Sequence, residues 1–330
     1  MRPFEYRRAA DPATAVDTVV AHPEAVYLGG GTNLVDHMRL GIVEPRLLVD
    51  VSDVTSDRIE ETGSGGVRIG AGVRNSDLAA SDLIRPRYPM LARALLAGAS
   101  PQLRNAATTG GNLLQRTRCP YFQDVTTPCN KREPGSGCSA IGGYDREQAI
   151  LGASQHCIAV HPSDMAVAMM ALDAVAVVYA SDGERRIPLD DLYRLPGSEP
   201  HRDTVLEQGD LITGVELPYR PLARHSTYRK VRERASYAFA LVSVAAALEL
   251  SDDRTVSDVL LAFGGVAHKP WRASRAEHAL RGEPATEESF RAAADAELSL
   301  AQPRDGNAYK VAMLRNTVVA VLRGLAEEET

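Results

Sequence analysis

The chain has few cysteines, few aromatic residues, no excess of positive charge and no long hydrophobic run. With four cysteines in 330 residues, it does not read as a small secreted domain held together by disulfides. Its formal net charge of −6, without basic runs or interleaved aromatic residues, argues against nucleic acid or an anionic membrane surface as a partner. No segment approaches the ~20 apolar residues of a membrane span. We expect a globular protein without membrane insertion, with small molecules or other proteins as partners.

Helix and strand patterns alternate along the chain without internal repeats, which predicts a mixed α and β protein. Residues 161–181 predict a helix that leads into a buried strand, followed by a hairpin turn at 181–184. The segment 195–210 is rich in Pro, Gly and polar residues. Beyond it come long alternating strands at 226–234 and 240–250 and then acidic helices, so we place a domain boundary near residue 220.

Two glycine-rich loops are the first chemical feature. Residues 27–41, YLGGGTNLVDHMRLG, place three glycines after an apolar strand, and residues 105–115, NAATTGGNLLQ, repeat the pattern of small residues, paired glycines and an Asn. Glycines leave backbone N–H groups open to a phosphate without interference from side chains. Neither loop has Rossmann or Walker spacing. A glycine-rich turn would explain either loop alone, whereas together they can hold the two phosphates of a dinucleotide.

The four cysteines have the spacing C-x9-C-x8-C-x18-C, and three of them lie in one loop rich in Pro and Gly. Two disulfides are a secondary interpretation for a large chain of this kind. Zinc usually takes thiolates from C-x2-4-C pairs, whereas wide spacings allow a loop to surround a larger group such as a 4Fe-4S cluster. The spacing alone leaves zinc and the cluster both open.

Five ordered segments carry a family resemblance: GGGTNL, ATTGGNL, SDMAVAMMALDA, YRKVRERASYAFALVSVAAALEL and FGGVAHKPWRA. Over essentially its whole length the chain resembles the FAD-binding subunit of the xanthine dehydrogenase and molybdenum hydroxylase family. The resemblance implies an α+β fold, with a two-part FAD-binding domain of the vanillyl-alcohol oxidase type in residues 1–220. An iron-sulfur loop at 116–157 belongs to that domain. A smaller α+β C-terminal domain occupies 221–330.

The resemblance also implies the residues that bind FAD. Asp164 would otherwise be a helix stabiliser, Lys230 a solvated strand lysine, and the two Asn residues simple turn formers. No catalytic side chain is expected, because the flavin itself takes up electrons. The implied FAD contacts are Leu28, Gly29, Gly30, Gly31, Thr32, Asn33, Leu34, Thr108, Thr109, Gly111, Asn112, Asp164 and Lys230.

The cysteine stretch resembles that of the flavin subunit of periplasmic-type aldehyde oxidoreductases, whose subunit carries a 4Fe-4S cluster beside FAD. This resemblance favours the cluster over zinc, with Cys119, Cys129, Cys138 and Cys157 as ligands. Nearby cations and open amides would help to offset the negative charge of such a cluster. These are Arg116, Arg118, Lys131 and Arg132, with the amides at Gly135 and Gly137.

Other polar residues in this stretch carry weaker indications of a role. Asp124 and Thr117 lie where they can contact either cofactor, and His156 and His161 are interpreted as structural. Tyr237 is a departure, because many relatives have an acidic residue at this position, close to the flavin.

The function implied is electron output from a heterotrimer. A large molybdenum-cofactor subunit would oxidise an aldehyde or a related substrate, a small subunit would carry electrons through 2Fe-2S centres, and this chain would pass them through FAD to an external acceptor. The alternatives are a stand-alone FAD-dependent oxidase and a zinc-stabilised non-enzymatic scaffold. The start, MRPFEYRRAADP, lacks the apolar core of a secretory signal, so the chain's own sequence favours the cytoplasm. An exported partner subunit would carry it to the periplasm.

Overall fold

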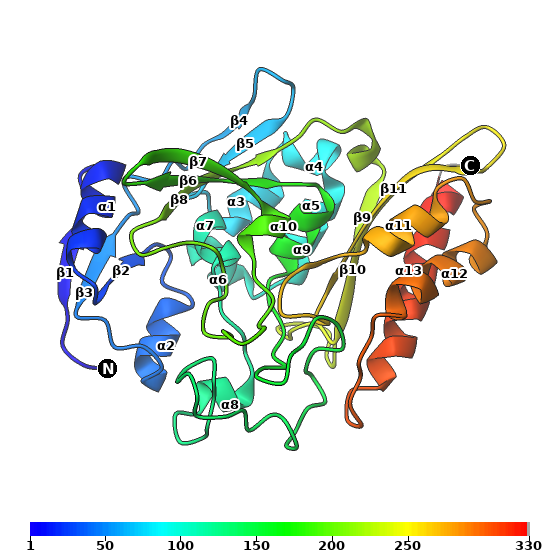
Figure 1. Ribbon diagram of the computed structural model, residues 1–330. Coiled ribbons are helices and arrows are strands. Elements are labelled where there is room, and N and C mark those ends of the chain that lie inside the picture. Colours follow the sequence, from blue (N-terminus) through cyan, green and yellow to red (C-terminus); the bar gives the residue numbers. More distant parts are fainter. Residues whose placement is uncertain (329–330) are drawn as a thin grey trace.

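A computed structural model describes residues 1–328, which contain three β-sheets with helices packed around them (Figure 1). The first sheet is parallel, with strand order β1-β3-β2, and helices α1 and α2 connect its strands. Asp11 caps α1 by accepting a hydrogen bond from the Thr14 N–H (2.7 Å). The bounds are β1 Glu5–Arg8, α1 Pro12–Ala21, β2 Ala25–Leu28, α2 Leu34–Leu40 and β3 Leu47–Asp50.

The second sheet is antiparallel, with order β4-β5-β8-β6-β7, and short helices pack against it. The helix, strand and hairpin predicted from residue 161 onward are confirmed as α9, β6 and β7. The strands are β4 Ile59–Glu61, β5 Val67–Gly70, β6 Val175–Ala180, β7 Gly183–Pro188 and β8 Leu211–Leu217. The helices are α3 Asn75–Ala80, α4 Ile84–Arg87, α5 Pro89–Ala97, α6 Pro101–Ala106, α7 Thr109–Leu113, α9 Asp164–Ala171 and α10 Leu189–Leu192.

The third sheet follows residue 225 and is antiparallel, with order β12-β11-β10-β9 and three helices beside it (Figure 1). With the two N-terminal sheets, it confirms the predicted α+β class. The elements are the 3-10 helix Pro221–Arg224, β9 Ser226–Val231, β10 Val242–Leu250, β11 Val256–Gly264, β12 Trp271–Arg272, α11 Ser274–Leu280, α12 Glu287–Leu298 and α13 Tyr309–Glu328. In residues 1–328 no helix combines the length and apolar character needed to cross a bilayer.

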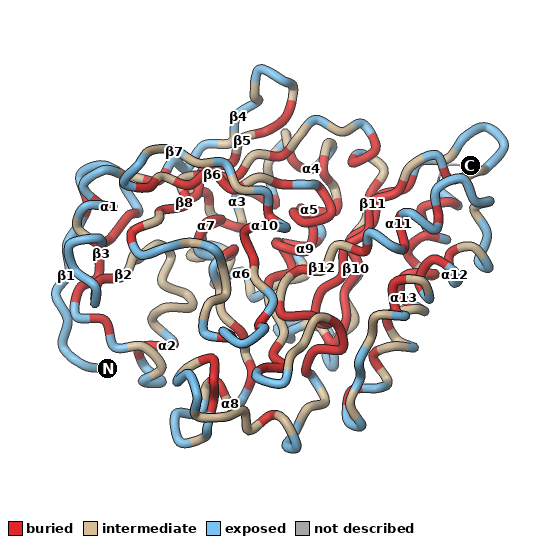
Figure 2. The backbone as a smooth tube through the Cα atoms, in the orientation of Figure 1, coloured by how far each residue is buried: buried red, intermediate tan, exposed pale blue. Residues whose placement is uncertain are grey.

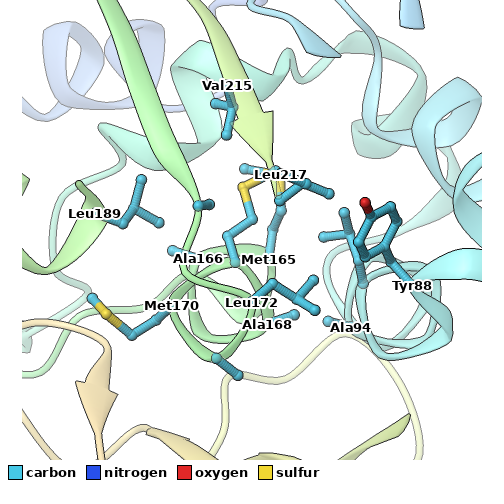
Figure 3. Close-up of a cluster of buried hydrophobic side chains, with 14 of the residues drawn as sticks. Tyr88, Ala94, Met165, Ala166, Ala168, Met170, Leu172, Leu189, Val215 and Leu217 are labelled. Atoms are coloured by element: carbon cyan, nitrogen blue, oxygen red, sulfur yellow. The ribbon is translucent and has the colours of Figure 1, made fainter. Parts of the chain in front are cut away.

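Strand β10 has the predicted alternation, but both of its faces are buried. Val244 and Leu248 belong to a core shared with α11, α12 and α13. Ala245 and Ala247 belong instead to a core formed with helix α9 and the second sheet. Figure 3 shows part of this core, with Met165 of α9 near Leu217. The C-terminal sheet is therefore a wall between two cores, one of them shared with the N-terminal region.

Residues 116–157 contain one short helix, α8 Pro120–Gln123, and otherwise run as irregular loops at the lower edge of the molecule in Figure 1. In Figure 2 this segment is nevertheless marked by several buried stretches. Its interior is a small cluster built around Phe122, Ile158 and the cysteines. Loop backbone is normally exposed because its polar groups need water. Here turn and side-chain hydrogen bonds satisfy part of the loop backbone.

Candidate functional site: two glycine loops and a cysteine cluster

The first glycine loop follows β2 and offers a row of open backbone donors. No described residue of the chain accepts a hydrogen bond from the backbone N–H of any residue from 29 to 33. Gly31 has φ +71°, a left-handed conformation that other residues rarely adopt. Consecutive unpaired N–H groups in such a turn form a concave binding site for an anion.

The second glycine loop packs directly against the first. A Cβ added to Gly30 would overlap the Ala106 carbonyl oxygen and lie 2.9 Å from its carbon. A Cβ on Gly29 would lie 3.2 Å from Thr108 Oγ1, and one on Gly111 would lie 3.0 Å from the same atom. Glycine is therefore required at position 30 so that the two loops can meet.

Thr108 and Thr109 hold the second loop in shape. Thr108 Oγ1 caps α7 by accepting a hydrogen bond from the Gly111 N–H (3.3 Å). The Thr109 hydroxyl donates to the Val73 carbonyl oxygen (3.1 Å), and Thr109 is fully buried. Both hydroxyls thus have structural partners, and the predicted contact of Thr109 with FAD stays a prediction.

The two predicted asparagines join the glycine loops to their neighbours. Asn33 Oδ1 accepts from the backbone N–H of Arg116 (2.9 Å), at the start of the cysteine segment. Asn112 Oδ1 accepts from Ser163 Oγ (2.5 Å), the residue that caps α9. These bonds link the first loop to the cysteine segment and the second loop to α9.

Asp164 and Lys230 form a buried ion pair between α9 and β9. Lys230 Nζ lies 2.7 Å from Asp164 Oδ2, with side-chain exposures of 3% and 8%. Tyr228 donates its hydroxyl to the other carboxylate oxygen (2.5 Å), and burial together with Asp164 raises the pKa of Tyr228 well above its ordinary value. Ser163 caps α9, so Asp164 does not serve as the cap. The Asp164 carboxylate instead bonds Tyr228 and Lys230 of β9, in the C-terminal sheet.

A cavity of about 480 Å³ lies between these elements, a volume typical of small-molecule sites. Six of the predicted FAD contacts line it: Thr32, Asn33, Gly111, Asn112, Asp164 and Lys230. The other seven are absent from its described lining: Leu28, Gly29, Gly30, Gly31, Leu34, Thr108 and Thr109. The structure thus brings together chain positions that are up to about two hundred residues apart.

Sequence reasoning missed several residues of the cavity wall. Asn75, Gln115 and Arg118 line it, and so does the loop that contains Tyr237 and Phe239. Tyr237 has φ +51° and is 57% exposed, so its ring lies at the rim. Arg118 places its guanidinium 5.2 Å from the centre of the Phe239 ring. Tyr237 departs from the family pattern, whereas no sequence pattern marks Asn75.

Cys119, Cys129 and Cys157 lie in one hydrophobic cluster that includes Phe122 and Ile158, and Cys138 packs against it. All four are free thiols; Cys138 is half-buried and the other three are buried. Burial raises the pKa of Cys157 to about 12, and nearby Lys131 opposes this shift. Burial also raises the pKa of Cys119. Thiols in such surroundings ionise only when a positively charged partner stabilises the thiolate.

The loop between Cys129 and Cys138 is a tight hairpin. The Asn130 N–H donates to the Gly137 carbonyl oxygen (2.6 Å), and the Gly137 N–H donates to Asn130 Oδ1 (2.8 Å). Gly137 needs its φ of +102° for this turn. Within residues 1–328, no three His, Cys, Asp or Glu side chains are grouped so as to hold a single metal ion.

The predicted cations of this segment differ in what they contact. The Lys131 ammonium is buried, donates to the Pro200 carbonyl oxygen (2.8 Å) and pairs with Asp203. Arg116 also pairs with Asp203 (2.7 Å). Burial alone would raise the pKa of Asp203, but His268, Lys131 and Arg116 hold it well below its usual range. These contacts of Asp203 and Pro200 hold the Pro/Gly-rich segment 195–210 against the cysteine loop.

The remaining residues singled out in this segment have local roles. Arg132 donates to the carbonyl oxygens of Tyr121 and Phe122, both at 2.9 Å. His161 is partly buried, and its ring contacts Tyr193 edge-on with the ring centroids 4.9 Å apart. Burial of the imidazole lowers the pKa of His161 to about 3. Thr117 Oγ1 accepts from the Cys119 N–H (3.2 Å) and Asp124 Oδ1 from the Thr126 N–H (2.9 Å).

Comparison with known proteins places these features in one class of protein. Residues 2–220 match the family described as the FAD binding domain in molybdopterin dehydrogenase, and residues 226–325 match the CO dehydrogenase flavoprotein C-terminal domain. The chain belongs to the family of FAD-binding subunits of molybdenum hydroxylases.

Individual relatives extend the match over the full chain. It is 50% identical over 323 residues to the aldehyde oxidoreductase FAD-binding subunit PaoB of Escherichia coli (strain K12), covering 98% of each chain. It is 26% identical to the glyceraldehyde dehydrogenase medium chain of Sulfolobus acidocaldarius, covering 85% of this chain and 82% of that one. The solved carbon monoxide dehydrogenase of Hydrogenophaga pseudoflava aligns with a TM-score of 0.75 at 26% identity, over 98% of this chain and 96% of that one.

Proposed function

We propose that this chain is the FAD-binding electron-transfer subunit of a molybdenum-containing aldehyde oxidoreductase complex. The observation that carries the proposal is the pair of interlocked glycine loops, whose open N–H groups lie beside a cavity lined by a buried ion pair. The match to PaoB along nearly the whole chain supports the aldehyde class of substrate. The partners would be a large molybdenum-cofactor subunit and a small 2Fe-2S subunit.

The residues present fit FAD. The N–H groups of residues 29–33 would donate hydrogen bonds to the pyrophosphate, and Thr32, Asn33, Gly111 and Asn112 would line the path of its polar chain. The buried ion pair of Lys230 and Asp164 places a polar group without net charge in the cavity wall. When bound, FAD supplies both one- and two-electron chemistry, and the protein positions and tunes it. We also propose that the chain has two domains, an FAD-binding domain of residues 1–220 and a C-terminal domain of residues 221–330.

A 4Fe-4S cluster held by Cys119, Cys129, Cys138 and Cys157 is a second part of the proposal. Cys119, Cys129 and Cys157 belong to one buried hydrophobic cluster, the half-buried Cys138 packs against it, and none of the four is consumed by a disulfide. Lys131 already opposes the rise in the pKa of Cys157, as a cation beside a thiolate ligand would. The cluster would give the irregular segment 116–157 the order that its own helix and strand content does not supply.

The experiment is purification of the chain alone and with its partners, followed by measurement of flavin, iron, acid-labile sulfide and zinc. We expect one FAD per chain, iron and sulfide in equal amounts, and no aldehyde oxidation without the molybdenum subunit. A purified chain that contains zinc and no acid-labile sulfide would overturn the proposed 4Fe-4S cluster. Bleaching of the isolated flavin by an alcohol or amine would instead indicate a stand-alone oxidase. Fractionation of cells with and without an exported partner subunit would decide between cytoplasm and periplasm.

A further inference from the structure

Arg118 places a guanidinium with open donors in the wall of the flavin cavity. Its Nη1 donates to the Arg116 carbonyl oxygen, and the guanidinium lies over the Phe239 ring, 5.2 Å from the ring centre. Its Nε and Nη2 donate to no residue of the described chain, and neither atom is enclosed by the protein. The side chain is therefore held on one side, while two donors of the cation are accessible to a ligand.

The charge of Arg118 is not balanced within the described part of the chain. Lys230, a second cation of the cavity wall, pairs with Asp164, whereas no acidic side chain in residues 1–328 forms an ion pair with Arg118. Burial lowers the pKa of Arg118 from its ordinary value, and Asp36 opposes this shift from a greater distance than an ion pair. A partly desolvated charge normally has a partner of opposite sign. An anionic group of a ligand would supply it.

The position of Arg118 indicates which anionic group this is. Arg116, whose carbonyl oxygen accepts from Nη1, donates its own backbone N–H to Asn33 Oδ1 (2.9 Å). Burial, together with the positive charges of Arg118 and Arg116, lowers the pKa of His37 in α2 to about 4. The guanidinium is thus tied to the end of the first glycine loop, where the open N–H groups of residues 29–33 lie.

We propose that the Arg118 guanidinium binds the pyrophosphate of the bound flavin dinucleotide through Nε and Nη2. A guanidinium presents parallel N–H groups that match two phosphate oxygens. The backbone N–H groups carry no net charge and Lys230 is neutralised by Asp164, so Arg118 would supply the countercharge. This inference rests on the proposed function, because it requires that FAD occupies the cavity.

The test is Arg118→Met, which keeps an unbranched side chain and removes the charge together with its donors. We expect the dissociation constant for oxidised FAD, measured by flavin fluorescence on the FAD-free protein, to rise about 10- to 100-fold, the usual effect of one lost hydrogen bond to a charged group. The reduction potential at saturating FAD should stay close to that of wild type, because the pyrophosphate has the same charge in both redox states. A clearly lower potential would place Arg118 at the reduced ring and overturn the assignment.

A conservative variant and a matched control make the outcome decisive. Arg118→Lys keeps the charge but not the paired donors, so its dissociation constant should lie between those of wild type and Arg118→Met. It also covers the case in which methionine disturbs the packing against Phe239. Arg39→Met removes an exposed arginine of α2 that is absent from the described cavity lining, and it should change neither quantity.

Two kinds of failure are distinguishable. Unchanged FAD affinity in both Arg118 variants, or an equal loss of affinity in the Arg39 variant, would overturn the role of Arg118 alone. Failure of the wild-type chain to bind FAD would overturn the proposed function itself.

Discussion

At the scale of single residues, the glycines of the two loops have unequal importance. A Cβ at position 30 would collide with backbone atoms of Ala106, whereas one at 111 would meet only the hydroxyl of Thr108 at 3.0 Å. Backbone cannot rotate aside as a side chain does, so the first conflict separates the loops and the second is relieved by a small movement. Glycine at 30 is thus fixed by the contact between loops as well as by the approach of a phosphate.

A series of three identical substitutions tests this difference. Gly30→Ala should abolish FAD retention and destabilise the fold by about 1–3 kcal/mol, the usual range for overpacking. Gly111→Ala should retain most of its flavin. Gly63→Ala, where nothing lies within 4 Å of the added carbon, serves as the matched control. Flavin absorbance per chain after gel filtration measures the outcome, and equal retention in the Gly30 and Gly111 variants would contradict the prediction.

Lys310 is a buried lysine at the beginning of α13. Its ammonium donates to the carbonyl oxygens of Glu147 (2.7 Å), Gln148 (3.1 Å) and Gly265 (2.8 Å), and burial lowers its pKa to about 7. An unfolded lysine titrates near 10.4. Between these values the unfolded chain binds more protons than the folded one. The contribution of Lys310 to stability therefore increases as the pH rises from about 7 to about 10.

Lys310→Met should remove that dependence. The free energy of unfolding of wild type minus that of the variant, from urea titrations, should increase between pH 7 and pH 9.5 by on the order of a few kcal/mol. The comparison between two chains cancels every group that they share. Parallel stability profiles over this range would show that Lys310 keeps an ordinary pKa in the folded state.

At the scale of elements, the cysteine segment depends on contacts from outside itself. At its start, the Arg116 N–H donates a hydrogen bond to Asn33 Oδ1. Asp203, in the segment 195–210, pairs with Arg116 and Lys131. Within the segment, Gln148 Nε2 lies 3.5 Å from Cys119 Sγ. From outside it, Asn307, which precedes α13, donates to the Gln148 carbonyl oxygen (3.3 Å). The segment is thus anchored at both ends and, through Lys131, at one point near its centre, and we expect the rest of the centre to rely on the cysteines.

Cys129→Ser should therefore affect the centre and spare the ends. We expect iron and acid-labile sulfide to fall together, proteolysis within 120–145 to become faster, and FAD to remain bound, because the glycine loops lie outside this stretch. Glu133→Gln, an exposed change in the same loop, should behave as wild type in all three measurements. Loss of iron without any change in proteolysis would show that the loop orders itself without the cluster.

At the scale of the whole molecule, the N-terminal region and the C-terminal sheet are joined by a shared core and by the pair Asp164 and Lys230. Removing one member of a buried pair leaves an uncompensated charge and costs about 3–5 kcal/mol. Asp164→Asn and Lys230→Met should each lower the stability of the FAD-free protein by that order. The double variant should lose clearly less than the sum, which a double-mutant cycle on unfolding free energies measures. Strict additivity would mean that the pair does not couple the two regions.

Much of the local structure follows from the sequence because local rules are strong there. The capping signal and apolar run from residue 161 predict α9 and β6 correctly, and the Gly-rich turn at 27–33 marks a loop between a strand and a helix. The order of the motifs also indicates the family that the comparisons confirm. These features depend on neighbours in the chain, whose geometry is limited by backbone sterics and by the spacing of apolar residues.

Contacts between distant segments were decided only by the tertiary structure. No pattern near Asn75 shows that its amide would lack a partner, and none near β10 shows that both of its faces would be covered. The requirement for glycine at position 30 comes from Ala106, a residue seventy-six positions away. Such properties depend on which surfaces meet when the chain packs, and packing is a sum over many weak contacts that a short window of sequence does not contain.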